Sequence, residues 1–165
     1  MARAMHGNRQ RGVAMVEFAI ALPVLLLLLF GIAEFGRMLF QYNSLLQASR
    51  DASRYAASEA WNATLGRVEL TSALQTQVKN IAVYGVPAPA LGASPAVPCL
   101  TTGNVTVAAE GTTHVRVSVS FAFRPVLGDR TANDCNVSTA GLPNFFSNPI
   151  PLALTLNASV VMRAL

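Results

Sequence analysis

The chain has 165 residues, of which 52% are hydrophobic and only 12% are charged. Because soluble domains carry about 25% charged residues on average, this composition argues against a purely soluble protein. The formal net charge is +4, but three of the twelve basic residues lie in residues 1–12, and without them nine basic residues face eight acidic ones. No basic stripe is left to hold phosphates, so the composition excludes a nucleic-acid-binding surface. The length allows one modest domain plus a membrane anchor.

Residues 13–33 follow the basic leader and contain a single charge, Glu17. As a helix rising about 1.5 Å per residue they extend roughly 32 Å, which is enough to cross a hydrocarbon core of about 30 Å. Arg3, Arg9 and Arg11 precede this stretch. The positive-inside bias therefore predicts a single-pass protein with a cytoplasmic N-terminus and an extracytoplasmic domain formed by residues 34–165.

Two simpler interpretations of the apolar stretch stay open. A cleavable secretory signal is one, because Gly31-Ile32-Ala33 has the small residues of a cleavage site. The apolar core of a signal is usually about 7–15 residues, however, and here the helical pattern continues past that point. An uncleaved anchor is the stronger alternative.

Glu17 distinguishes this stretch from an ordinary anchor, because a carboxylate among apolar residues is costly unless it is paired or near the headgroups. Gly12 ends the leader, and Glu17 is the fifth residue after the Gly12–Val13 bond. Cleavage of that bond would give Val13 a free α-amine, which in a helical assembly would neutralise Glu17 of a neighbouring subunit. We therefore predict that Gly12 and Val13 are processing positions and that Glu17 is a subunit contact.

Helical periodicity continues beyond the membrane stretch, to about residue 60. Apolar and small residues recur every three or four positions and form a stripe, which consists of Phe35, Leu39, Tyr42, Leu46, Ser49, Ala52, Ala56 and Ala57. Such a stripe packs more often against the protein's own sheet than against another subunit. Asp51 and Arg54 are three residues apart, which predicts an ion pair across one turn.

A second helix is expected to begin at Thr64 as its N-cap and to end at Gly85. Its apolar face comprises Leu65, Val68, Leu74, Val78 and Ile81. Residues 86–98 contain four prolines, which indicates a loop with extended character.

The period then changes to two, which predicts strands. Val105 and Val107 precede a turn at residues 110–112, and alternating apolar residues follow from Val115 to Phe123. After a long irregular loop at residues 124–149, residues 152–162 alternate again. A three-stranded antiparallel sheet with one apolar face needs a cover, which the helix stripe supplies. The predicted fold is therefore α+β, with a long N-terminal helix packed on a small antiparallel sheet.

Cys99 and Cys135 lie outside the membrane on this topology and flank the predicted hairpin. Two cysteines in an oxidising compartment most simply form a disulfide, although free thiols are the alternative. The bond would close a loop of about 37 residues and contribute roughly 4 kcal/mol on the chain-entropy estimate. No His or CxxC motif lies beside either cysteine, so we predict no metal site.

The sequence also contains no recognisable catalytic constellation. Its two histidines are His6 in the leader and His114 on the polar side of a strand. Ser118 and Ser120 lack the strand–turn–helix setting of a nucleophile elbow, and no phosphate-binding loop is present. We therefore expect a protein that is not an enzyme and that has no cofactor.

Several motifs in the N-terminal third carry a family resemblance. The pattern of a type IV prepilin cleavage site is a glycine, four further residues, a glutamate and a long apolar helix. Gly12, Glu17 and the apolar stretch fit this pattern. More specifically, the first third resembles the TadE-like family of tight-adherence (Tad) pilus assembly proteins. The matching segments are Val16-Glu17-Phe18, Leu22-Pro23, Phe30-Gly31-Ile32, Glu34-Phe35-Gly36-Arg37 and residues 48–56. One departure is Val13, where many type IV pilins carry an aromatic residue that is N-methylated.

The resemblance implies a pilin-like subunit of the bacterial inner membrane that takes part in assembling a Tad pilus for surface adhesion. It implies as partners a prepilin peptidase, the major Tad pilin, other minor pilin-like proteins and the inner-membrane pilus platform. The alternative is an uncleaved bitopic envelope protein whose outer domain binds a partner or ligand.

Overall fold

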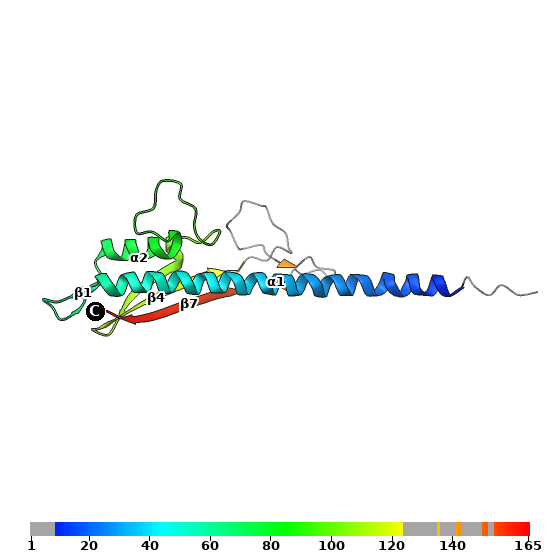
Figure 1. The fold of residues 1–165 in the computed structure, drawn as a ribbon, viewed down its shortest axis with the longest axis horizontal. Helices are drawn as coiled ribbons and strands as arrows, with labels where there is room; N and C mark the ends of the chain where they lie inside the picture. Colours follow the sequence, from blue (N-terminus) through cyan, green and yellow to red (C-terminus); the bar gives the residue numbers. More distant parts are fainter. Residues whose placement is uncertain (1–8, 124–134, 136–140, 143–149, 152–153) are drawn as a thin grey trace, which may run out of the picture. The chain divides into compact units, whose positions relative to one another are not determined.

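The computed structural model describes residues 9–123, 135, 141–142, 150–151 and 154–165. The chain divides into two units, Met1–Arg37 and Met38–Leu165. The helix α1 (Arg9–Glu59) contributes residues to both units (Figure 1).

In the first unit, α1 packs against no other apolar segment among the described residues. Every residue from 12 to 33 is exposed, including the leucine run Leu25–Leu29. Exposing such an apolar surface to water is unfavourable, whereas lipid or neighbouring apolar helices can cover it. The prediction of a membrane-spanning stretch therefore agrees with the structure in length and in exposure.

The second unit contains the predicted three-stranded sheet. Strands β3 (Val105–Glu110), β4 (His114–Ala122) and β7 (Thr155–Arg163) are antiparallel and lie in the order β3-β4-β7. Val117 is central, because it pairs with Val107 on one side and with Val160 on the other. The buried residues of β4 are Val115, Val117, Val119 and Phe121, while Arg116 and Ser120 are exposed. The expected alternation and the α+β class are both confirmed.

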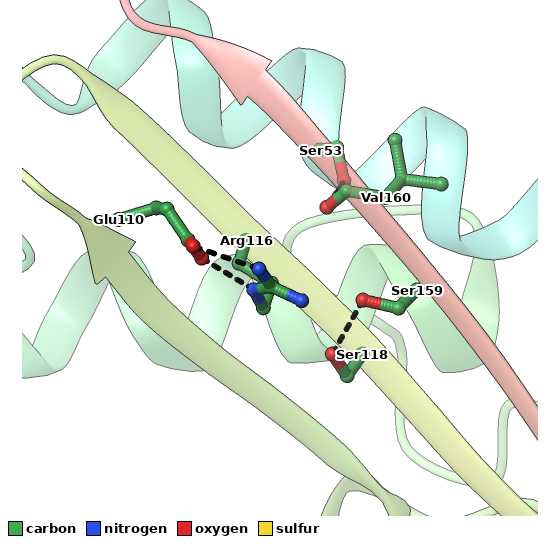
Figure 2. A network of polar contacts seen from close by, with 6 residues as sticks. All are labelled: Ser53, Glu110, Arg116, Ser118, Ser159 and Val160. Carbon is green, nitrogen blue, oxygen red and sulfur yellow. Dashed lines mark hydrogen bonds and ion pairs between the residues drawn. The ribbon is translucent and has the colours of Figure 1, made fainter.

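Two helices supply the rest of the core. The buried residues of α1 are Leu45, Ser49, Ala52, Ser53, Ala56 and Ala57, with Ala60 just after the helix. Helix α2 (Ser72–Tyr84) adds Leu74, Val78, Ile81, Ala82 and Val83. The Ser53 hydroxyl donates to the carbonyl of Ser49 at 2.7 Å and lies 3.5 Å from the carbonyl of Val160 in β7 (Figure 2). Small side chains therefore let α1 approach the strand closely.

The helix stripe differs in detail from its prediction. Phe35 is 57% exposed and Leu39 44% exposed, whereas Leu45, absent from the predicted stripe, is fully buried. The predicted pair of Asp51 and Arg54 is also wrong. The Asp51 carboxylate instead accepts hydrogen bonds of 3.0 and 3.1 Å from the Gln47 amide, four residues earlier on the same helix.

The second helix begins later than predicted. Its N-cap is Thr71, whose hydroxyl accepts from the Leu74 amide, and Leu65 is exposed. Strands β1 (Trp61–Asn62) and β2 (Arg67–Val68) pair before it. The Asn62 side chain accepts from the amides of Thr64 and Leu65, and Gly66 has a φ of 60°, so a turn replaces the expected first helical residues. The predicted end is correct, because Gly85 caps α2 with a φ of 76°.

The remaining segments are short. No helix or strand lies in residues 86–98, as expected, and the single-turn helix η1 (Thr102–Asn104) precedes β3. Strand β5 (Gly141–Leu142), within the expected loop at residues 124–149, pairs with β6 (Ile150–Pro151), which directly follows that loop. The sequence pattern did not predict this ladder. Most of that loop, with residues 152 and 153 of the predicted third strand, lies outside the described residues.

Candidate functional site: the N-terminal helix and the outer unit

The first candidate site is the exposed part of α1. Among the described residues, α1 is one helix that is long and apolar enough to cross a membrane. Its apolar stretch ends at an ion pair, in which Arg37 Nη2 lies 2.6 Å from Glu34 Oε1 one turn earlier. This pair neutralises the first two charges after the apolar stretch, because residues three apart on a helix lie on the same side.

Gly12 and Val13, the predicted processing positions, lie near the beginning of α1. A methyl group added at Gly12 would meet no atom within 4 Å, and Val13 is 69% exposed. The described residues therefore leave the bond between them uncovered. The structure contains no processed form, so cleavage at this bond stays a prediction.

Glu17 lies one turn after Val13 and faces apolar side chains of its own helix. It lines a groove of about 550 Å³ with Ile20, Ala21, Val24, Leu25 and Leu28. Within the described residues its carboxylate makes no hydrogen bond or ion pair. The carboxylate of Glu17 therefore lies beside an apolar surface on which an apolar neighbour could pack. The role of Glu17 as a subunit contact stays a prediction.

The two cysteines form the predicted disulfide. Cys99 and Cys135 are bonded, with their Cα atoms 5.5 Å apart and a separation of 36 positions in sequence. Cys99 has a φ of 67°, which is unusual for a residue other than glycine. It packs against the core, whereas Cys135 is exposed. The bond therefore ties the segment between α2 and η1 to a position beyond β4.

The outer face of the sheet carries polar pairs (Figure 2). Arg116 on β4 donates from two nitrogens to the Glu110 carboxylate on β3, and the Ser118 and Ser159 hydroxyls lie 2.9 Å apart across β4 and β7. The hydrogen bond from Arg116 lowers the pKa of Glu110 below its ordinary value, and Glu110 raises the pKa of Arg116. His114, which the sequence places on this face, is half-buried, with Nδ1 2.9 Å from the Thr113 hydroxyl.

A pocket of about 430 Å³ in the outer unit was not anticipated from the sequence. Its lining consists of Glu59, Ala60, Trp61, Asn62, Ala63, Glu69, Thr71, Ala73, Leu74 and Gln77. These residues come from the end of α1, the β1–β2 turn and the first turns of α2. Glu59 and Glu69 are ten residues apart in sequence, and only the unpredicted β1–β2 pairing brings them to one pocket. No pattern in the sequence indicated this site.

The described parts of the chain show no cluster of three His, Cys, Asp or Glu side chains that would hold a metal ion.

Comparison with known families agrees with the resemblance seen in the first third of the sequence. Residues 12–54 match the family described as TadE-like protein. No curated protein and no solved structure matches the chain. The matched segment begins at Gly12 and covers the apolar stretch, Glu17 and most of the helix that packs on the sheet. By this match, the N-terminal segment carried on α1 is similar to that of TadE-like proteins, over about a quarter of the chain.

Proposed function

We propose that the protein is a pilin-like membrane subunit that takes part in assembling a Tad-type pilus for surface adhesion. The observation that carries the proposal is the TadE-like match at residues 12–54, which coincides with a helix exposed along its entire apolar stretch. The family implies an association with Tad pilus components in the membrane. The role is structural rather than catalytic.

In the proposed life cycle, residues 1–12 are a leader that a prepilin peptidase removes after Gly12. Residues 13–33 hold the protein in the bacterial inner membrane, with the N-terminus in the cytoplasm and residues 34–165 outside. The cysteine pair supports this orientation, because disulfides persist in oxidising compartments. The major Tad pilin, other minor pilin-like proteins and the inner-membrane platform are the proposed partners.

N-terminal sequencing of the protein extracted from membranes tests the processing step. A start at Val13 is expected. An intact Met1 would remove the peptidase from the proposal and favour an uncleaved bitopic envelope protein whose outer unit binds a partner. A start at Glu34 would instead indicate a secreted domain.

Glu17→Ala tests the proposed subunit contact. The substitution removes a costly charge from the apolar stretch, so membrane insertion should be unchanged or improved. Pilus assembly should nevertheless be impaired, because the amine of a neighbouring subunit loses its partner. Pilus yield from cells that carry the variant is the measurement. Met15→Ala, an exposed change about 200° away around the same helix, is the control and should assemble normally.

Normal pilus yield from Glu17→Ala would reject the pairing of Glu17 with a neighbouring amine. It would leave the family assignment in place, because that assignment depends on the whole of residues 12–54.

A further inference from the structure

The second unit exposes apolar side chains at the end where the chain enters it from the membrane stretch. Leu39 and Phe40 are among the first residues of this unit, and they are 44% and 72% exposed. Leu154, just before β7, is 49% exposed. We call these three residues the entry patch.

The direction of β7 places Leu154 at the same end of the unit. The Ser53 hydroxyl lies 3.5 Å from the Val160 carbonyl oxygen. Further along both elements, the Leu165 amide donates to the Ala57 carbonyl at 3.3 Å. Strand β7 therefore runs alongside α1 in the same direction (Figure 1). Its beginning, which Leu154 precedes, consequently lies toward the beginning of the unit.

Apolar exposure on α1 ends abruptly at Phe40. The exposed residues of the helix after this position are all polar, namely Asn43, Gln47, Arg50, Asp51, Arg54, Ser58 and Glu59. Glu34 and Arg37 interrupt the apolar surface before it, but they form an ion pair without net charge. The boundary between the apolar and the water-facing surface of α1 therefore lies after Phe40 rather than at the ion pair.

The length of the apolar surface indicates what covers it. At about 1.5 Å per residue, α1 rises roughly 42 Å from Val13 to Phe40. A bilayer is about 30 Å thick in its hydrocarbon core and about 40–45 Å thick with its headgroup layers. Residues 13–33 match the core, so residues 34–40 match a headgroup layer. The Cα–Cβ bonds of a helix also tilt toward its N-terminus, which directs the Phe40 ring back toward the membrane stretch.

We propose that the entry patch contacts the phospholipid headgroup layer of the leaflet from which the second unit emerges, with Phe40 at the boundary between headgroups and acyl chains. Phenylalanine and leucine side chains are buried favourably at this depth. The contact holds the beginning of the unit on the membrane surface and sets the depth of the anchor. The inference rests on the membrane anchoring in the proposed function, but it requires neither cleavage after Gly12 nor the Glu17 contact.

Depth-dependent fluorescence quenching tests the contact. The full-length protein carries Trp61→Phe, which removes its single tryptophan, and is reconstituted in liposomes of phosphatidylethanolamine and phosphatidylglycerol. Phe40→Trp then supplies the reporter. We expect blue-shifted emission, because the indole leaves bulk water. A nitroxide on the lipid headgroup should quench this emission several-fold more strongly than a nitroxide near the end of the acyl chain.

Two further reporters in the Trp61→Phe background are the controls. Leu65→Trp replaces a leucine that is 51% exposed in the β1–β2 turn, after the other end of α1, and should show water-like emission without quenching. Leu27→Trp, within the membrane stretch, should be quenched most by the acyl-chain label. The Cys99–Cys135 disulfide, read on a non-reducing gel, shows that each variant folds.

The reporters separate failure of the inference from failure of the proposed function. Water-like, unquenched emission from Phe40→Trp, beside a quenched Leu27→Trp, would overturn the inference alone. Blue-shifted emission that neither label quenches, and that disappears as the protein is diluted in lipid, would overturn it in favour of a contact between copies of the chain. An unquenched Leu27→Trp would reject the membrane anchoring itself, and the inference with it.

Discussion

Gly12 and Glu17 are separated by little more than one helical turn, and nothing in the described chain covers either residue. Their proposed roles are therefore intermolecular: one is a recognition residue for a peptidase and the other a charge for a neighbouring subunit. Neither role leaves a trace in the packing of a single chain. Single substitutions can consequently separate function from folding at both positions.

Gly12→Ala is expected to abolish or strongly reduce processing without harming the helix. A methyl group at this position meets no atom within 4 Å, and alanine favours a helix over glycine by about 1 kcal/mol. The measurement is the apparent mass and N-terminal sequence of the membrane-extracted variant. Gly36→Ala, an equally uncrowded change on the same helix, should be processed normally. Unaltered cleavage of Gly12→Ala would reject Gly12 as the specificity residue.

The ion pair of Glu110 and Arg116 makes a pH-dependent contribution to stability. Arg116 lowers the pKa of Glu110 in the folded protein, so the pair stabilises the fold above the ordinary pKa of glutamate. That contribution is lost as the pH falls through the lowered value. Arg116→Gln should therefore raise the pKa of Glu110 toward its ordinary range, as followed by NMR titration of its carboxyl carbon. Arg163→Gln should leave it unchanged, and a Glu110 pKa that does not respond to Arg116→Gln would contradict the assignment.

At the scale of elements, the second half of α1 functions as the cover of the sheet. Ser49, Ala52, Ser53 and Ala56 are all fully buried, and each is small. These residues let the helix lie close to β7, as the approach of Ser53 to Val160 shows. The stripe predicted from periodicity is therefore intramolecular at residues 45–60.

Ala56→Leu tests this close packing. The added volume has no space against the sheet, and overpacking of a core typically costs about 1–3 kcal/mol. The free energy of unfolding, measured by denaturant titration in detergent, should fall by that amount. Asn43→Leu introduces the same side chain at an exposed position of α1 and should change stability by less than about 0.5 kcal/mol. Equal stability of Ala56→Leu and wild type would show that the helix does not lie tightly on the sheet.

At the scale of the whole molecule, the outer unit combines a small sheet, two helices and one covalent link. The core formed by β3, β4, β7, α1 and α2 is continuous. The segment from Val86 to Thr101 has no helix or strand, and its contacts include buried Val97 and Leu100 together with the disulfide at Cys99. The disulfide is therefore a covalent constraint on the segment that joins α2 to the sheet, beside the buried side chains of Val97 and Leu100.

Replacing Cys99 and Cys135 together by serine should lower the free energy of unfolding by roughly 4 kcal/mol on the chain-entropy estimate. Denaturant titration of the oxidised protein and of the double variant is the measurement. A reducing agent should destabilise the wild type by a similar amount and leave the double variant unchanged. Equal stability of all four samples would contradict a structural role for the bond.

Local patterns predicted a large part of this architecture. The apolar stretch of residues 13–33, the alternation in β4 and the glycine stop after α2 are local signals, and each agrees with the structure. The beginning of α2 was misplaced because the Asn62 side chain and Gly66 favour a turn over a helix that Thr64 alone would allow. The exposed Leu39 and the buried Leu45 show that periodicity does not decide which side of a long helix meets the sheet.

What the sequence by itself determined is the anchor, its charges, the α+β class and the likeness to TadE-like proteins, because these depend on composition and short-range spacing. Tertiary structure alone decided which side chains of α1 are buried, how Cys99 meets Cys135, and that Glu59 and Glu69 share a pocket. Those features join residues from different elements. Their geometry depends on how the chain folds back on itself, and no local pattern encodes it.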